Sequence, residues 1–299
     1  SMVTDWSNQL LRSLLFAPGN HPRKVAKVGS FGADALVLDL EDAVAIGEKE
    51  KTRGVVRSAL PTYTRGVVSV RINGLQTGLA LADLEAVVCP DLDAVLLPKV
   101  ESAEMLAEVD QALARHEKRE GIPVGTIRVL PQIETALGIL KVDEIALGAP
   151  VRVHTLIFGM ADFTAELGVD LTADGTEILY ARSRVVVAAR AAGLAPPIDG
   201  PYLLSLHDHD GLVEDCRRVR QLGFAGKVVI YPPHVAPVNA AFAALSDEEH
   251  RRLREIVAAF EAAETAGSAS IQVNGVFVDY PIYKRALHKL RLADAARSQ

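Results

Sequence analysis

The feature that most constrains the fold is a repeated alternation of short apolar runs with helical patterns. The runs lack strict polar alternation, which is typical of strands buried on both faces of a parallel sheet. Helical patterns such as Ser102–Glu120, Glu177–Ala192 and Gly211–Leu222 lie between most of them, and a glycine follows each of these three. The eight runs are Ser13–Pro18, Ala35–Leu40, Val67–Ile72, Ala94–Lys99, Ile127–Ile133, His154–Gly159, Pro196–Pro201 and Lys227–Pro232.

Eight strand–helix units predict an α/β protein with a (β/α)8 TIM barrel. The alternative is an open, doubly wound sheet. The length of 299 residues suits eight units, and no nucleotide-binding fingerprint follows the first run. The sequence therefore favours the barrel.

The chain continues beyond the eighth run with a predicted helix and a β-hairpin. Ser246–Ala266 is a helical pattern that opens with a capping box, in which Ser246 and Glu249 satisfy each other's backbone N–H groups. Asn274-Gly275 then separates two alternating segments, which predicts a two-residue hairpin turn. We expect a barrel domain at 10–245 and a C-terminal helix–hairpin lid at 246–299, which would either lie over a face of the barrel or reach a neighbouring subunit.

Composition excludes several classes of partner. The net charge is −6, so a nucleic-acid partner is not expected. No apolar run approaches about 18 residues, so no membrane span is expected either. The chain has two cysteines, Cys89 and Cys216, and we interpret them as buried free thiols of a cytoplasmic protein.

In a (β/α)8 barrel the functional residues lie at the carboxyl ends of the strands. Acidic side chains from several of these ends would meet at one mouth, where they would raise each other's pKa values unless a cation lay between them. The residues at these ends, in chain order, are Pro18, Gly19, Asn20, Asp39, Glu41, Asp42, Arg71, Asn73, Lys99, Gln132, Glu134, Asp162, Asp199, Tyr231 and His234.

The acids favour a Mg²⁺ site, because all the candidate ligands are oxygens and no Cys/His cluster with zinc spacing accompanies them. Mn²⁺ accepts the same ligands. We predict Glu134 and Asp162 as direct ligands. Glu41 and Asp42 would hold metal-bound waters. The alternative for a single acid at such a position is a helix cap or an ion pair.

Arg71 lies among these acids and can bind a carboxylate with two parallel hydrogen bonds. A metal ion together with an arginine suits a 2-oxo acid. The alternative is that Arg71 simply pairs with Glu41 or Asp42.

Seven segments follow one another in an order that is typical of one family. With them the chain resembles the citrate lyase β-subunit-like group of the HpcH/HpaI aldolase superfamily, from about Leu11 to Pro281. The segments are "LRSLLFAPGN", "ALVLDLEDAV", "VRIN", "LLPKVES", "PQIETALG", "FGMADF" and "GFAGKVVIYP".

The resemblance implies a Mg²⁺-dependent lyase that cleaves a 3-hydroxyacyl-CoA thioester, such as malyl-CoA or citramalyl-CoA, into an acyl-CoA and a 2-oxo acid. It implies that Glu134 and Asp162 bind the metal and that Arg71 holds the substrate carboxylate. It also implies that Asp279, in the segment Gly275–Pro281, is a catalytic acid/base delivered to the site of a neighbouring subunit. A homotrimer or a dimer of trimers is therefore expected.

The chain departs from the family pattern at two places. It has "IYPPH" where relatives often have "IHPxQ", which leaves the acyl chain and the oxo acid open. After the first run it has "HPRKVAK". There Arg23 and Lys24 are candidates for contacts with the CoA phosphates, beside Pro18 and Gly19 as substrate-binding positions. The alternative for the two basic residues is a solvated helix start.

Two other functions stay open at this stage. One is a metal-dependent aldolase or thioesterase variant, and the other is a citrate lyase β subunit that works with an acyl carrier protein. His207–Asp210, "HDHD", has the composition of a metal cluster, but we interpret it as a polar loop that caps the following helix.

Overall fold

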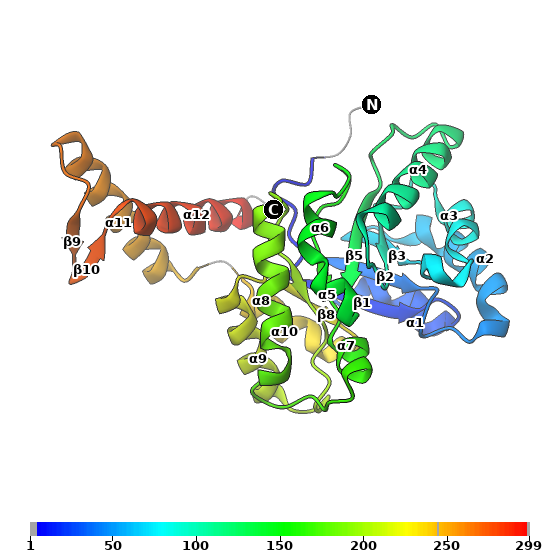
Figure 1. Cartoon of the computed structure of the whole chain (residues 1–299). Helices are drawn as coiled ribbons and strands as arrows, with labels where there is room; N and C mark the ends of the chain where they lie inside the picture. Colours follow the sequence, from blue (N-terminus) through cyan, green and yellow to red (C-terminus); the bar gives the residue numbers. More distant parts are fainter. Residues whose placement is uncertain (1–4, 244, 298–299) are drawn as a thin grey trace. The chain divides into compact units, whose positions relative to one another are not determined.

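A closed barrel of eight parallel strands forms the larger part of the protein (Figure 1). This computed structural model describes residues 5–243 and 245–297. Neighbouring strands pair in chain order, and β1 pairs with β8 to close the barrel. The prediction of a (β/α)8 barrel is therefore confirmed. The strands are β1 (Ser13–Pro18), β2 (Ala35–Asp39), β3 (Val67–Arg71), β4 (Ala94–Leu97), β5 (Arg128–Ile133), β6 (Ile157–Phe158), β7 (Ile198–Asp199) and β8 (Gly226–Val229).

Helices follow the strands and surround the barrel (Figure 1). Several begin at residues with short polar side chains: Ser102 caps α4 and Asp208 caps α9 through side-chain oxygens that accept backbone N–H groups. The "HDHD" segment thus caps a helix, as expected. The helices of the larger unit are α1 (Pro22–Lys27), α2 (Lys49–Ala59), α3 (Ala80–Val87), α4 (Ala103–Arg119), α5 (Ala136–Leu140), α6 (Val142–Leu147), α7 (Met160–Leu167), α8 (Thr176–Ala191), α9 (His209–Leu222) and α10 (Val235–Ala241). Helices α11 (Asp247–Thr265) and α12 (Tyr280–Arg297) belong to a second unit.

Two hydrophobic cores stabilise the barrel. One lies between the strands and the surrounding helices. The other gathers alternate residues of the strands, for example Leu14, Val37, Leu96 and Leu130, inside the barrel. Because successive side chains of a strand point to opposite faces, membership of the inner core identifies which strand residues face the mouth.

The sequence overestimates two of the strands. The runs His154–Gly159 and Pro196–Pro201 contain the two-residue strands β6 and β7. Prolines at the start of the second run cannot donate to a strand ladder, which shortens the regular pairing there.

The chain divides into two compact units. The larger comprises Leu11–Phe242 with the residues before Asn8. The smaller comprises Asn8–Leu10 and the chain from Ala243 onward. Residues 298–299 of the predicted extension lie outside the described residues.

The smaller unit contains α11, the hairpin of β9 (Ile271–Val273) and β10 (Val276–Val278), and α12. The predicted capping box of Ser246 and Glu249 is present at the start of α11. Asn274 and Gly275 both have positive φ, as a type I′ turn requires. The sequence analysis assigned no structure to the tail after the hairpin, and the structure places α12 there. The smaller unit has its own hydrophobic core, which includes Phe260. The ring of Phe260 stacks on that of Tyr283 with 4.5 Å between the ring centroids.

Cys89 and Cys216 are buried and free, as predicted. Across the described ranges, no helix has both the length and the apolar character that a membrane crossing requires.

Candidate active site at the barrel mouth

Charged side chains follow the inner core toward the carboxyl ends of the strands. Asp39 lies two residues after the inner-core Val37, and Glu134 lies four residues after the inner-core Leu130. Both therefore project from the inner face of the barrel. Arg71 ends β3 opposite Asp39, its partner in the strand register.

Arg71 and Asp39 form a buried bidentate ion pair. Arg71 Nε donates to Asp39 Oδ1 at 2.8 Å, and Nη2 donates to Oδ2 at 2.6 Å. Asp39 also accepts the backbone N–H groups of Glu41 and Ala43, so it shapes the loop after β2. The alternative that Arg71 pairs with Glu41 or Asp42 is partly right, because Nη1 lies 3.4 Å from Glu41 Oε1, but the main partner of Arg71 is Asp39.

The environment keeps Arg71 charged. Burial opposes the charge, but the hydrogen bonds and the charge of Asp39 outweigh it and raise the pKa of Arg71. The guanidinium also lies over the ring of Phe16, 4.9 Å from its centroid. Asp39 occupies only the Nε/Nη2 edge of the guanidinium. On the Nη1/Nη2 edge, Nη1 lies 3.4 Å from Glu41 Oε1 but makes no hydrogen bond to it, so this edge keeps donors for a substrate carboxylate.

Glu41 lies between two cations and is 5% exposed. Its Oε1 is 3.4 Å from Arg71 Nη1 and has no hydrogen-bond partner, while its Oε2 accepts from Lys99 Nζ at 3.2 Å. Burial raises the pKa of Glu41, and the nearby charge of Asp42 adds to the increase. Asp42 itself is exposed at the rim.

Glu134 is the most perturbed acid of the site. It is 3% exposed, and its Oε1 accepts the backbone N–H of Lys99 at 3.0 Å. Burial, and then the charges of Asp162 and Glu41, raise the pKa of Glu134 to about 8. Asp162 lies in the first turn of α7, directly after β6.

These acids suit a hard divalent cation. A buried carboxylate next to other carboxylates is costly, and a cation between them removes that cost. Within residues 5–243 and 245–297 no group of three or more His, Cys, Asp or Glu residues has the arrangement of a metal site. Two carboxylates are nevertheless sufficient for Mg²⁺, which usually keeps several waters. The unpartnered Oε1 of the buried Glu41 could accept a hydrogen bond from such a water.

The loop after β1 approaches the same strand ends. The backbone N–H of Gly19 donates to the carbonyl oxygen of Asp39 at 2.9 Å. A Cβ at Gly19 would lie 2.8 Å from that oxygen, so only glycine permits this approach of Pro18-Gly19 to β2. Arg23 and Lys24 follow on α1, and both are exposed.

Asp279 belongs to the smaller unit. Its Oδ1 accepts the backbone N–H of Ile282 at 3.3 Å, and its carbonyl oxygen accepts that of Tyr283. It therefore caps the first turn of α12 and is half-buried there. The residues that the structure brings together at the barrel mouth are Arg71, Glu41, Glu134 and Asp162, with Asp39 and Lys99.

Asp199 does not face the mouth, although it lies at a strand end. Its neighbour Ile198 belongs to the inner core, so Asp199 points outward to the helices. There it accepts from the fully buried Lys227 Nζ at 2.6 Å and from Arg182 of α8. Asp215 of α9 completes a closed group of two cations and two anions, 2.7 Å from Lys227 Nζ.

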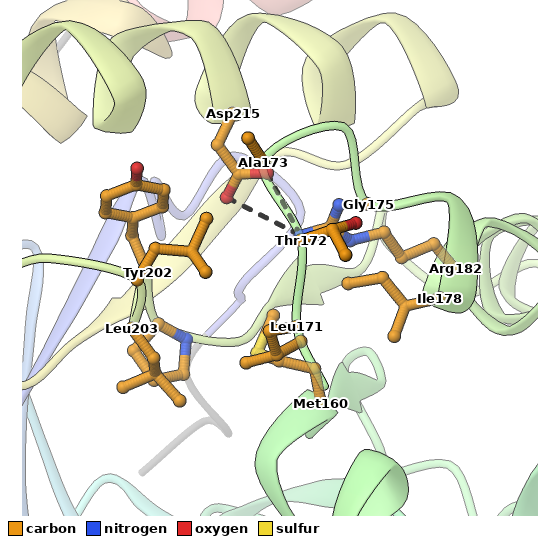
Figure 2. A pocket seen from close by; sticks show the side chains of 12 residues that line it. Met160, Leu171, Thr172, Ala173, Gly175, Ile178, Arg182, Tyr202, Leu203 and Asp215 are labelled. Atoms are coloured by element: carbon orange, nitrogen blue, oxygen red, sulfur yellow. Dashed lines mark hydrogen bonds and ion pairs between the residues drawn. The ribbon is translucent and has the colours of Figure 1, made fainter. Parts of the chain in front are cut away.

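A pocket of about 300 Å³, part of it open to solvent, borders this ion group (Figure 2). The loop between α7 and α8 and the segment after β7 form its walls, and Arg182 and Asp215 meet at one side. Glu134 and Asp162 do not line it. Because its charged groups are paired with one another, the pocket adds no reactive group to the barrel mouth.

Sequence reasoning left two features of the site unassigned. Lys99 was only a strand-end residue, although its backbone and ammonium bind two different carboxylates. Asp39 was likewise only a strand-end residue, although it is the main partner of Arg71. Asp39 and Arg71 end adjacent parallel strands, so strand order and register together were the signal that could have paired them.

Comparison with known proteins gives three related results. The family model described as HpcH/HpaI aldolase/citrate lyase matches residues 12–232. The citrate lyase subunit beta of Leuconostoc mesenteroides subsp. cremoris is 38% identical over 291 residues, covering 97% of this chain and 95% of that protein. The mitochondrial citramalyl-CoA lyase of Rattus norvegicus is 33% identical, covering 96% and 87%.

A solved structure extends the similarity to three dimensions. Protein CitE from Mycobacterium tuberculosis, crystallised with magnesium, acetoacetate and coenzyme A, has a TM-score of 0.75 and 30% identity, covering 96% of this chain and 99% of that one. The match of the family model to most of the barrel, together with relatives of near-equal length, shows that this chain belongs to the HpcH/HpaI aldolase/citrate lyase family.

Proposed function

We propose that the protein is a Mg²⁺-dependent carbon–carbon lyase that cleaves, or forms, a 3-hydroxyacyl-CoA thioester such as malyl-CoA or citramalyl-CoA. The products of cleavage are an acyl-CoA and a 2-oxo acid. The observation that carries this proposal is the buried Glu134 beside Asp162, next to Arg71, whose Nη1 lies 3.4 Å from Glu41 without a hydrogen bond. Relatives named citrate lyase subunit beta and citramalyl-CoA lyase support it.

Glu134 and Asp162 would hold the metal ion, with Mn²⁺ as a substitute for Mg²⁺. When bound, the ion supplies a Lewis acid that lowers the pKa of the substrate hydroxyl. Glu41 and Asp42 would hold waters around it. Arg71 would orient the substrate carboxylate through its Nη1/Nη2 edge, because Asp39 already occupies the Nε/Nη2 edge.

The reaction moves one proton. In cleavage the hydroxyl proton passes to a base, and the electrons of the carbon–carbon bond pass to the α-carbon of the thioester. That carbon then receives a proton, which balances the loss from the hydroxyl. We assign the proton transfer to Asp279, delivered with the C-terminal lid to a neighbouring subunit of a homotrimer or a dimer of trimers. A lid would exclude water and keep that carboxylate basic.

The coenzyme A moiety needs cationic contacts for its phosphates. Arg23 and Lys24 are exposed on α1, directly after the close approach of Pro18-Gly19 to β2. We therefore place the CoA phosphates at α1 and the acyl end at the barrel mouth. We also propose that the protein is cytoplasmic.

A coupled assay tests the proposal. The purified protein is offered L-malyl-CoA and the citramalyl-CoA stereoisomers, with Mg²⁺ and then with EDTA, while release of the 2-oxo acid is followed. We expect metal-dependent cleavage of at least one, and its loss in the Glu134→Gln variant. If correctly folded protein releases no oxo acid from any of them, a CoA-thioester lyase of this kind is refuted.

Asp279→Asn tests the acid/base assignment separately. We expect it to keep metal and CoA binding but to lose most turnover, on the order of 10²–10⁴-fold, because a general acid/base contributes about that much. Wild-type turnover in this variant would remove Asp279 from the mechanism.

The 38% sequence identity to a citrate lyase subunit beta favours a second candidate, a subunit that works with an acyl carrier protein. Co-purification of such a carrier, together with inactivity on free CoA thioesters, would support it. A metal-dependent aldolase or thioesterase variant would instead release an oxo acid from a free hydroxy acid, or free CoA without the oxo acid.

A further inference from the structure

Lys99 has an unusual backbone conformation. In the part of the chain that the structure describes, only Lys99 and Asn274 are non-glycine residues with positive φ, at 53° and 49°. The hairpin turn explains Asn274. Lys99 lies in no such turn, since it follows the end of β4 at the barrel mouth. Strained residues of this kind persist only where their surroundings hold them, and they gather at functional sites.

Three hydrogen bonds hold this conformation. The N–H of Lys99 donates to Glu134 Oε1 at 3.0 Å. Its carbonyl oxygen accepts from Gln76 Nε2 at 2.9 Å. The N–H of the next residue, Val100, donates to the carbonyl oxygen of Gln132 at 3.2 Å. Hydrogen bonds thus fix the backbone on both sides of Lys99, and one of them is accepted by the buried carboxylate of Glu134.

The hydrogen bond from the Lys99 N–H orients the carboxylate of Glu134. With Oε1 occupied by the Lys99 N–H, Oε2 points to Gly159, where a Cβ would lie only 2.6 Å from it. Gly159 immediately precedes α7, whose first turn carries Asp162. The free oxygen of Glu134 therefore faces the start of the helix that bears the other acid.

The side chain of Lys99 acts on a different carboxylate. Its ammonium donates to Glu41 Oε2 at 3.2 Å and is 40% exposed. This bond occupies Oε2 of Glu41 and leaves its Oε1 without a hydrogen bond. One residue thus presents one acid and restrains the other.

We infer that Lys99 is a positioning residue whose left-handed backbone directs Glu134 Oε2 toward the metal. The inference rests on the proposed role of Glu134 as a metal ligand, and it concerns a residue that has no role in that proposal. The conformation, and not only the charge, is what the site requires.

A matched pair of variants separates backbone from charge. Lys99→Met and Lys99→Val both remove the ammonium, but β-branched valine is strongly disfavoured at positive φ and methionine much less so. Mn²⁺ binding, followed by electron paramagnetic resonance, is the readout, since it does not depend on turnover. We expect Lys99→Val to bind Mn²⁺ on the order of 10–100-fold more weakly than Lys99→Met, the usual effect of losing a group that orients a ligand.

Lys99→Gly is the second test, because glycine adopts positive φ freely and keeps the N–H. It should bind Mn²⁺ at least as tightly as Lys99→Met. Equal affinities of folded Lys99→Val and Lys99→Met would overturn the inference. If Lys99→Val does not fold, Gln76→Ala replaces it: weaker Mn²⁺ binding than wild type is expected, and wild-type affinity would overturn the inference.

The baseline distinguishes failure of this inference from failure of the proposed function. Wild type should bind Mn²⁺ and Glu134→Gln should not. If that baseline holds while all the Lys99 variants bind Mn²⁺ with the same affinity, only the positioning role is wrong. If Glu134→Gln binds Mn²⁺ like wild type, the metal assignment and the inference fall together.

Discussion

The buried ion group behind β7 and β8 gives the sharpest prediction about stability. Lys227 Nζ lies 2.6 Å from Asp199 and 2.7 Å from Asp215, and its side chain is fully buried. Burial opposes its charge, but the two carboxylates outweigh it and raise the pKa of Lys227. Arg182 binds the same two carboxylates, so the group is neutral as a whole.

Lys227→Met removes one cation and leaves two buried carboxylates with a single arginine. Removing one partner of a buried pair costs about 3–5 kcal/mol. Because β7 has only two residues, this group is also what ties that strand to α8 and α9. At about 2–4 °C per kcal/mol for a large domain, we expect the melting temperature to fall by about 10 °C.

The assay is thermal unfolding followed by circular dichroism, with Lys227→Met/Asp215→Asn as the compensating variant. The second change removes the surplus negative charge and leaves Arg182 with Asp199. We expect it to recover at least half of the loss. The reasoning is refuted if Lys227→Met melts within about 2 °C of wild type, or if the double variant is less stable than the single one.

Further predictions concern the site itself. Gly159→Ala would place a Cβ 2.6 Å from Glu134 Oε2 and 2.7 Å from its Cβ, so we expect Mn²⁺ affinity to fall by about tenfold or more, measured by titration. Gly54→Ala, in α2 with open space around it, is the matched control and should instead stabilise the protein by about 0.5–1 kcal/mol without changing Mn²⁺ binding. In metal-free protein the pKa of Glu134 is raised from an ordinary value of 4.5 to about 8. Between these pH values the folded state holds a proton that the unfolded state has lost. The stability of the folded state should therefore fall as pH rises from 4.5 to about 8. Thermal melts with Mg²⁺ and with EDTA should therefore differ more at pH 8 than at pH 6, and an equal or smaller difference at pH 8 would contradict the assignment.

Much of the fold could be predicted from local patterns. The turn at Asn274-Gly275 and the capping box at Ser246 form as expected because each depends on a few neighbouring residues. Each of the eight apolar runs overlaps a barrel strand, because short apolar segments without polar alternation are typical of strands buried on both faces. The helix α12 was missed, since it is stabilised by packing on α11 and the hairpin rather than by a strong pattern of its own.

The sequence by itself determined which acids stand at the strand ends, and with them the chemistry that the barrel mouth can offer. Only the tertiary structure decided the partners. Arg71 pairs with Asp39 because they are opposite in register, and Asp199 turns outward because side chains alternate along a strand. The positive φ of Lys99 depends on bonds from Gln76 and Glu134, which lie 23 and 35 residues away in the chain. Contacts of that kind are properties of the closed barrel, so no local pattern could reveal them.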